Sequence, residues 1–160
     1  MKFARTLIAS VAAGLLATSA IAMTKEEHKT AKDNIEATYK ADKNNCDALT
    51  ANAKDICQKE AKGKEKVAKA ELEAQYKPSA KNTQKVAEAR AEAAYDVAKE
   101  KCDDLKGNEK DVCEKDAKAA HVKAKEDAKV AAAQAKPADS AAEKNAAVAE
   151  ARKDANAEKN

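Results

Sequence analysis

The fold is decided by the stretch Cys46-Asp-Ala-Leu-Thr-Ala-Asn-Ala-Lys-Asp-Ile-Cys57, which returns 56 residues later as Cys102-Asp-Asp-Leu-Lys-Gly-Asn-Glu-Lys-Asp-Val-Cys113. Seven positions of the motif coincide, and the two copies use all 4 cysteines of the chain. The match extends outward to Tyr39 and Tyr95. Self-similarity at a fixed spacing indicates an internal duplication. The sequence therefore predicts two tandem units of one design.

Composition predicts that these units are helical. Beyond residue 22 the chain has neither Trp nor Phe and consists mostly of Ala, Lys, Glu and Asp, which are good or tolerable helix residues. Breaks occur at 77–79, 106–108 and 136–140, where Pro, Gly, Ser and Asn gather. Thr24 with Glu27 has the spacing of a capping box, and Asn52 and Asn108 each precede an acid by three residues. We expect helices at 24–49, 53–76, 80–105, 109–135 and 140–157.

Apolar residues recur on these helices at alternating steps of four and three, which is typical of a packed helix face. The predicted stripe of the second unit is Ala91, Tyr95, Ala98, Cys102 and Leu105, and that of the first is Ile35, Tyr39, Asp42, Cys46 and Leu49. Small residues bury little apolar area each, at roughly 25 cal/mol per Å². Such seams would be weak without reinforcement.

The cysteines are the expected reinforcement. On one straight helix, residues 11 positions apart lie about 16 Å apart, whereas a disulfide needs Cα atoms within about 7 Å. A turn between the paired cysteines removes this conflict, so we expect Cys46 to pair with Cys57 and Cys102 with Cys113, each bond contributing roughly 3 kcal/mol. Crossed or intermolecular pairing remains an alternative. The predicted fold is all-α: two tandem disulfide-stapled antiparallel αα-hairpins plus a C-terminal helix or disordered tail.

The N-terminus predicts export. Residues 1–22 combine the basic Lys2 and Arg5, an apolar stretch and the cleavage site Ala20-Ile21-Ala22, as in a cleavable signal peptide; an uncleaved anchor is less favoured. We expect hairpin repeats at 23–77 and 78–136 and a low-complexity tail at 137–160, a solvated tail being favoured over a helix ordered by a partner. A periplasmic location would oxidise the cysteines.

Several function classes have little support in the sequence. The chain beyond residue 22 holds 29 basic and 28 acidic residues, without the basic face and aromatic groups typical of nucleic-acid binding. No catalytic motif, cofactor motif or ligand spacing for a metal is evident, and His28 and His121 are interpreted as solvated helix residues. No later apolar run favours stable membrane insertion. We therefore expect a protein that is not an enzyme and uses no cofactor.

The motif and composition also resemble a known group. Small exported, Ala/Lys/Glu-rich proteins of proteobacteria carry a similar Cys-Asp-x-Leu motif ending in Lys-Asp-Val/Ile-Cys, here at 46–57 and 102–113, and are loosely labelled TolA-like envelope proteins. The resemblance covers most of 24–130 and implies no assigned activity. TolA itself is membrane-anchored and has a globular C-terminal domain, whereas this sequence has a predicted cleavable signal and four cysteines.

Three functions remain as hypotheses. The first is a periplasmic helical scaffold or interaction protein of the envelope, for which both a protein partner and self-association are compatible with the sequence. The second is a hydration protein resembling late-embryogenesis-abundant proteins, disordered until drying. The third is a periplasmic chaperone, for which the scarcity of aromatic residues and Met is unfavourable.

Overall fold

The protein is a row of helices. The computed structural model describes residues 23–135 and 141–157, and the predicted signal peptide at 1–22 lies outside the described residues. Within these ranges the chain forms five helices and no strand: α1 (Lys25–Cys46), α2 (Ala51–Tyr76), α3 (Ala80–Cys102), α4 (Asn108–Ala135) and α5 (Ala141–Ala157). The all-α prediction is confirmed.

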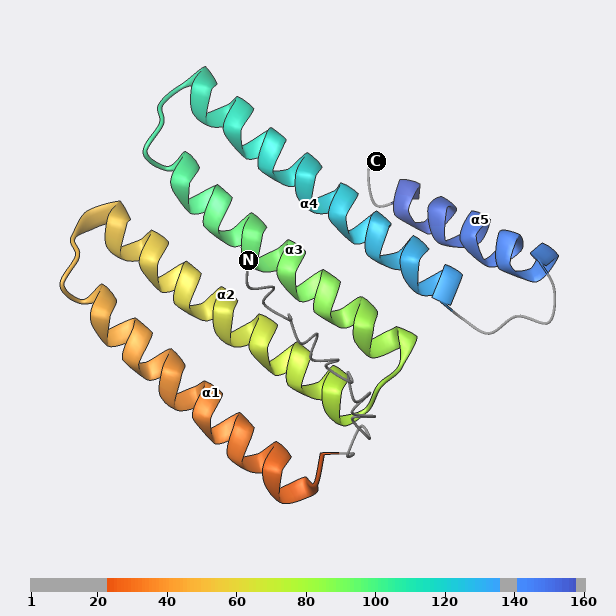
Figure 1. Cartoon of the computed structure of the whole chain (residues 1–160). Helices are drawn as coiled ribbons and strands as arrows, with labels where there is room; N and C mark the ends of the chain where they lie inside the picture. Colours follow the sequence, from red (N-terminus) through yellow and green to blue (C-terminus); the bar gives the residue numbers. More distant parts are fainter. Residues whose placement is uncertain (1–22, 136–140, 158–160) are drawn as a thin grey trace, which may run out of the picture.

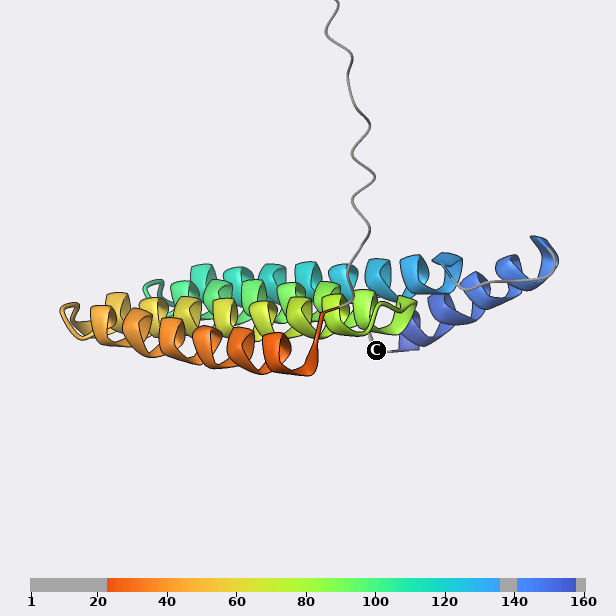
Figure 2. The same ribbon diagram turned by 60° about the horizontal axis from the view of Figure 1, so that its bottom comes forward.

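Helices α1 to α4 lie antiparallel and side by side in one layer (Figure 1), and the turned view shows this layer almost edge-on (Figure 2). Among the described residues each helix contacts only its neighbours in the chain: α1 with α2, α2 with α3, α3 with α4, and α4 with α5. The sequence left open whether the hairpins form one bundle or an extended array. The structure is a flat array, so both faces of the layer are left uncovered by the other described helices.

The flatness has a local cause in α3. Cys102 faces α4, because it bonds Cys113, and Ala93 faces α2, because it meets Gly63. These two positions are nine residues apart, which is about 180° around a helix of 3.6 residues per turn. A helix with contact stripes on opposite sides continues a row, whereas adjacent stripes would close a bundle.

Both predicted disulfides are present. Cys46 bonds Cys57 with Cα atoms 5.6 Å apart, and Cys102 bonds Cys113 with Cα atoms 5.7 Å apart. Among the described residues no cysteine is free. Each bond joins two antiparallel helices just beside their connecting turn, as the spacing of the motif predicts.

The two turns show the role of two positions that both copies of the motif share. Asp47 pairs with Lys54 at 2.9 Å, and Asp103 pairs with Lys110 at 2.6 Å, so the shared Asp and Lys of the two copies form the same bridge across each turn. In each pair the hydrogen bond from the lysine lowers the pKa of the carboxyl group. The bond to Asp103 also raises the pKa of Lys110.

The helices α1 and α3 end earlier than predicted. They stop at Cys46 and Cys102, and the next backbone groups turn back, with the N–H of Leu49 donating to the carbonyl of Cys46 and that of Leu105 to Cys102, each at 3.0 Å. Leu49 and Leu105 are 41% and 37% exposed. The expectation that these leucines belong to the buried stripe is therefore wrong, because the helical register ends three residues before them.

The helix starts are partly as predicted. Thr24 and Glu27 form the expected capping box, in which the hydrogen bond from the Thr24 backbone lowers the pKa of Glu27. Asn52, however, lies inside α2, whose N-cap is Thr50, and its side chain donates to the backbone carbonyl of Glu100 in α3 at 2.9 Å. Asn108 is the first residue of α4 and not its cap.

The buried side chains are small and lie in the seams. Apart from Gly63, they are Cys46, Ala61, Leu72, Ala89, Ala91, Cys102, Ala128, Ala132 and Ala133. The only fully buried ones among the described residues are Cys46 and Cys102. The predicted helix at 140–157 is present as α5 (Ala141–Ala157), which lies against α4. With seams this thin, the best-buried side chain of each hairpin is one cysteine of its disulfide, Cys46 or Cys102.

Candidate interaction surface

The seam between α2 and α3 joins the two hairpins, and the two helices approach closely there. Gly63 is buried there, and a Cβ built on it would lie 2.8 Å from the Cβ of Ala93. Cβ atoms of two residues do not come so close, so any residue larger than glycine at position 63 would force the helices to shift. The seam is thus fixed by one small residue on each helix.

Ion pairs cross this seam along its length. Glu71 accepts from Arg90 at 2.6 Å, Lys59 lies 3.5 Å from Glu100, and Glu60 lies 3.8 Å from Lys101. A further pair joins Lys66 to Glu92. These charges are exposed or half-exposed, and such surface pairs contribute about 0–1 kcal/mol each. They define the register of α3 on α2 more than they stabilise the fold.

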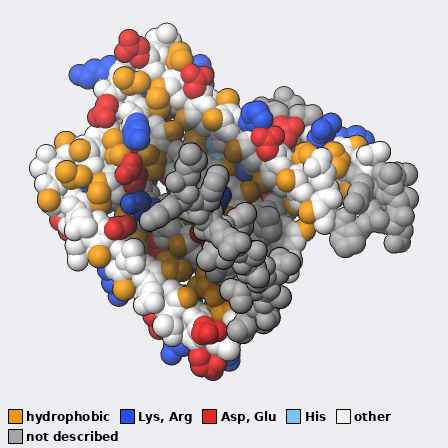
Figure 3. Space-filling model, in the orientation of Figure 1, with side chains coloured by type: hydrophobic (Ala, Val, Ile, Leu, Met, Phe, Trp, Pro, Cys, Tyr) orange, Lys and Arg blue, Asp and Glu red, His pale blue; other side chains and the backbone are white. Residues whose placement is uncertain are grey.

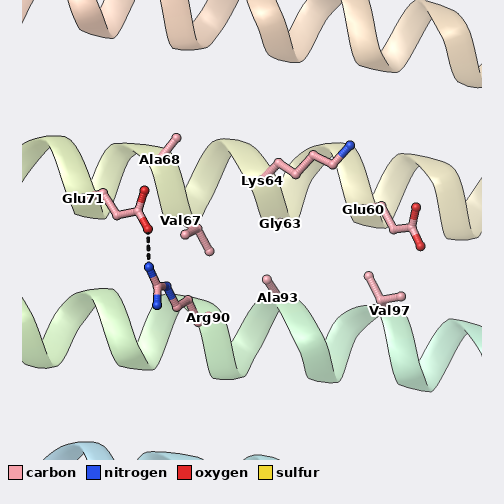
Figure 4. A pocket seen from close by; sticks show the side chains of 9 residues that line it. All are labelled: Glu60, Gly63, Lys64, Val67, Ala68, Glu71, Arg90, Ala93 and Val97. Atoms are coloured by element: carbon pink, nitrogen blue, oxygen red, sulfur yellow. Dashed lines mark hydrogen bonds and ion pairs between the residues drawn. The ribbon is translucent and has the colours of Figure 1, made fainter. Parts of the chain in front are cut away.

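A shallow groove of ≈ 410 Å³ runs over the seam (Figure 4). Gly63 and Val67 of α2 and Ala93 and Val97 of α3 form its apolar floor, while Glu71 and Arg90 bridge one end. Glu60, Lys64 and Ala68 complete the lining. The groove is open to solvent, and a shallow apolar floor between charged side chains suits contact with another helix better than enclosure of a small molecule.

The two faces of the layer differ in chemistry. On α3 the groove side carries Ala87, Arg90, Ala94, Val97, Ala98 and Lys101, and the other side carries Lys85, Glu88, Glu92, Asp96, Lys99 and Asp103, as the helical period places them. On α2 the side away from the groove likewise carries only charged residues at Asp55, Lys62, Lys66, Lys69 and Glu73. Figure 3 shows the groove side, with hydrophobic side chains between charged ones where grey atoms do not cover it.

The charged face is held by pairs between neighbouring helices. Lys69 of α2 lies 2.7 Å from Glu65 on its own helix and 3.4 Å from Glu36 on α1. The hydrogen bond to Glu65 is the larger cause, and that to Glu36 a smaller one, of a raised pKa for Lys69. A face composed of such pairs is well solvated and offers little apolar area to a partner. The groove side is therefore the better candidate surface.

Both histidines differ from the interpretation as solvated residues. His28 lies 4.3 Å from the Tyr76 ring between centroids, and its Nε2 is 2.8 Å from an oxygen of Glu73. His121 stacks on Tyr95 at 4.8 Å. The sequence did not reveal these pairs because their partners lie on the neighbouring helices. Each pair joins the two helices of one hairpin, so the histidines fill seams.

The described part of the chain holds two disulfides and no metal-binding group. No group of three or more His, Cys, Asp or Glu lies together there in a way that could hold a metal ion. The predicted site residues Cys46, Cys57, Cys102 and Cys113 are all engaged in disulfides. What the arrangement offers chemically is a broad surface that includes the apolar, charge-flanked groove over the α2–α3 seam.

Comparison with protein-family models, with curated proteins and with solved structures finds no match to this chain. Among the described residues, no helix combines the length and apolar character needed to cross a membrane. The geometry of the layer is therefore the basis for a functional proposal.

Proposed function

We propose that this chain is an exported, non-enzymatic helical interaction protein of the cell envelope. The observation that carries the proposal is the two-sided layer, with one charged face and one face bearing an apolar groove over the α2–α3 seam. Export is supported by the signal-like residues 1–22 and by two disulfides of the kind formed in oxidising compartments. A periplasmic location agrees with both features.

Photo-crosslinking in living cells tests the interaction role. A photoreactive residue would replace Val97 on the groove side of the full chain or, as a matched control, Lys99, which lies two residues and about 200° further around the same helix. We expect a discrete adduct from position 97 and none from position 99. Absence of any adduct from several groove-side positions would count against an interaction role.

Export and folding are measured on the same material. The periplasmic fraction should contain a chain beginning at Met23, with both disulfides intact by mass after alkylation without reductant. Far-UV circular dichroism should show a cooperative thermal melt that drops on reduction. A chain without a transition in either redox state would instead favour the hydration-protein hypothesis.

A further inference from the structure

We infer that the groove side of the layer is covered by the same side of a second copy of this chain, related by a two-fold axis that runs parallel to the helices above the α2–α3 seam. This inference rests on the two-sided layer and does not depend on where in the cell the protein acts. The first partner of the groove side is thus a second copy of the chain.

The single layer creates the need for a cover. Stable domains are normally built of two or more packed layers around a core, whereas here the helices contact only their chain neighbours and Cys46 and Cys102 are the only fully buried side chains in the described part. Val67 and Val97 on the groove floor are half-buried. A second layer over the groove would complete their burial.

The edges of the layer are poorly suited to self-association. On α3 the side facing α2 uses Arg90, Glu100 and Lys101 for ion pairs across the seam. The positions 56 residues earlier on α1, at its free edge, are Asn34, Asn44 and Asn45, all exposed and neutral. At the other end, α5 already lies against α4. A hairpin of a second copy could not form the same ion pairs at the α1 edge as α3 forms with α2. The groove side of the layer is therefore the surface left for self-association.

The charges of the groove complement themselves under one symmetry. Two ion pairs cross the seam at different levels, Glu60 with Lys101 and Glu71 with Arg90. Rotation about an axis along the seam exchanges α2 and α3, so each acid comes to lie over the base of the other copy. An axis perpendicular to the helices would instead oppose Glu60 with Glu71 and Arg90 with Lys101, and like charges repel.

The available area is sufficient. Helices of 22 to 28 residues at 1.5 Å per residue, packed about 9 Å apart in a row of four, give a face on the order of 1,200 Å². A standard specific interface needs about 800 Å² from each partner. The groove would lie at the centre of such an interface, where apolar contacts contribute most.

Sedimentation velocity of residues 23–160 with intact disulfides, from 1 to 100 micromolar as approximate limits, tests the inference. We expect a dimer whose dissociation constant rises roughly tenfold or more in Val97→Lys. Asp96→Lys is the matched control, because Asp96 directly precedes Val97 in the chain but lies on the charged side of α3, away from the groove. It should change the dissociation constant less than about threefold. Circular dichroism checks that each variant remains folded.

A charge exchange tests the symmetry. Glu71→Arg places two bases over one another and should weaken the dimer, whereas the double variant E71R/R90E restores opposite charges both within and between copies and should recover it. A chain that stays monomeric throughout this concentration range overturns the inference, as does a Val97→Lys variant that dimerises as tightly as wild type. In cells, a position-97 adduct with a mass other than twice the chain would assign the face to a different partner and overturn the inference while leaving the interaction role intact.

Discussion

At the scale of single residues, the two turns differ at one position. Ala51 has φ 51° and Gly107 has φ 56°, so the same place in each motif is left-handed, with an alanine in the first copy and a glycine in the second. This conformation costs a residue with a Cβ about 1–2 kcal/mol, and glycine adopts it freely. The first turn is therefore strained relative to the second.

We predict that Ala51→Gly raises the free energy of unfolding by about 1 kcal/mol and that Gly107→Ala lowers it by a similar amount. Urea denaturation of each variant measures this. Ala53→Gly is the control, because Ala53 is exposed within α2 without a positive φ. It should destabilise by about 0.5–1 kcal/mol. If Ala51→Gly and Ala53→Gly lowered the free energy of unfolding equally, the assignment of strain to Ala51 would be contradicted.

The bridge across the second turn predicts a pH dependence. Lys110 lowers the pKa of Asp103 below its ordinary value of 3.8, so the folded state binds this proton less readily than the unfolded state. The pair therefore stabilises the fold above the unfolded pKa, and the contribution is lost as pH falls through the folded pKa. We expect Asp103→Asn to be less stable than wild type at pH 7 and to lose less stability on acidification below about pH 4.

Asp104→Asn is the matched control for this prediction, since the adjacent carboxylate forms no ion pair with the described residues. Its unfolding curve should follow that of wild type across the same pH range. An Asp103→Asn variant with an acid limb as steep as that of wild type would show that the bridge does not form in solution.

At the scale of helices, the cysteine spacing and the Gly and Pro breaks were enough to predict two stapled hairpins. A disulfide between residues 11 positions apart requires a turn between them. The ends were less predictable. Leu49 and Leu105 continue the apolar spacing, and only the backbone turn after each cysteine removes them from the seam. Asn52 fits a capping pattern but is used between helices instead, which a local pattern could not reveal.

In the α2–α3 seam, a substitution that favours helix formation should nevertheless destabilise the protein. Alanine is intrinsically better than glycine in a helix by about 1 kcal/mol, yet Gly63→Ala would place its Cβ 2.8 Å from that of Ala93. We expect Gly63→Ala to destabilise the protein. Adding Ala93→Gly removes the clash, so a double-mutant cycle on unfolding free energies should give a favourable coupling of about 1–3 kcal/mol. Additive effects would mean that the helices lie further apart.

At the scale of the whole molecule, the flat layer was not foreseen. The deciding signal is present in the sequence as two opposed stripes on α3, small residues towards α2 and the stapled stripe towards α4, but the prediction followed only the second. A second signal is the charge at Lys85, Glu88, Glu92, Asp96 and Lys99. Its restriction to one face becomes meaningful only once the layer is known, and so does the candidate groove.

The row predicts that the two disulfides act locally. Cys46→Ser with Cys57→Ser, and Cys102→Ser with Cys113→Ser, should each lower the free energy of unfolding by roughly 3 kcal/mol. Because α1 contacts only α2 among the described helices, losing the first bond should expose the α1 amides to hydrogen exchange while those of α3 and α4 keep their protection. Uniform loss of protection along the chain would indicate a single cooperative unit instead.

The sequence order of the disulfides has a consequence for biosynthesis. Each bond joins a cysteine to the next one along the chain, so a chain that meets an oxidant from its N-terminus onward closes Cys46–Cys57 before Cys102 arrives. Consecutive oxidation thus gives the native pairing without a later exchange step. We expect the reduced protein to regain both bonds in air-oxidised buffer without an isomerase, as peptide mapping would show, whereas abundant crossed pairs would show that the turns do not form early.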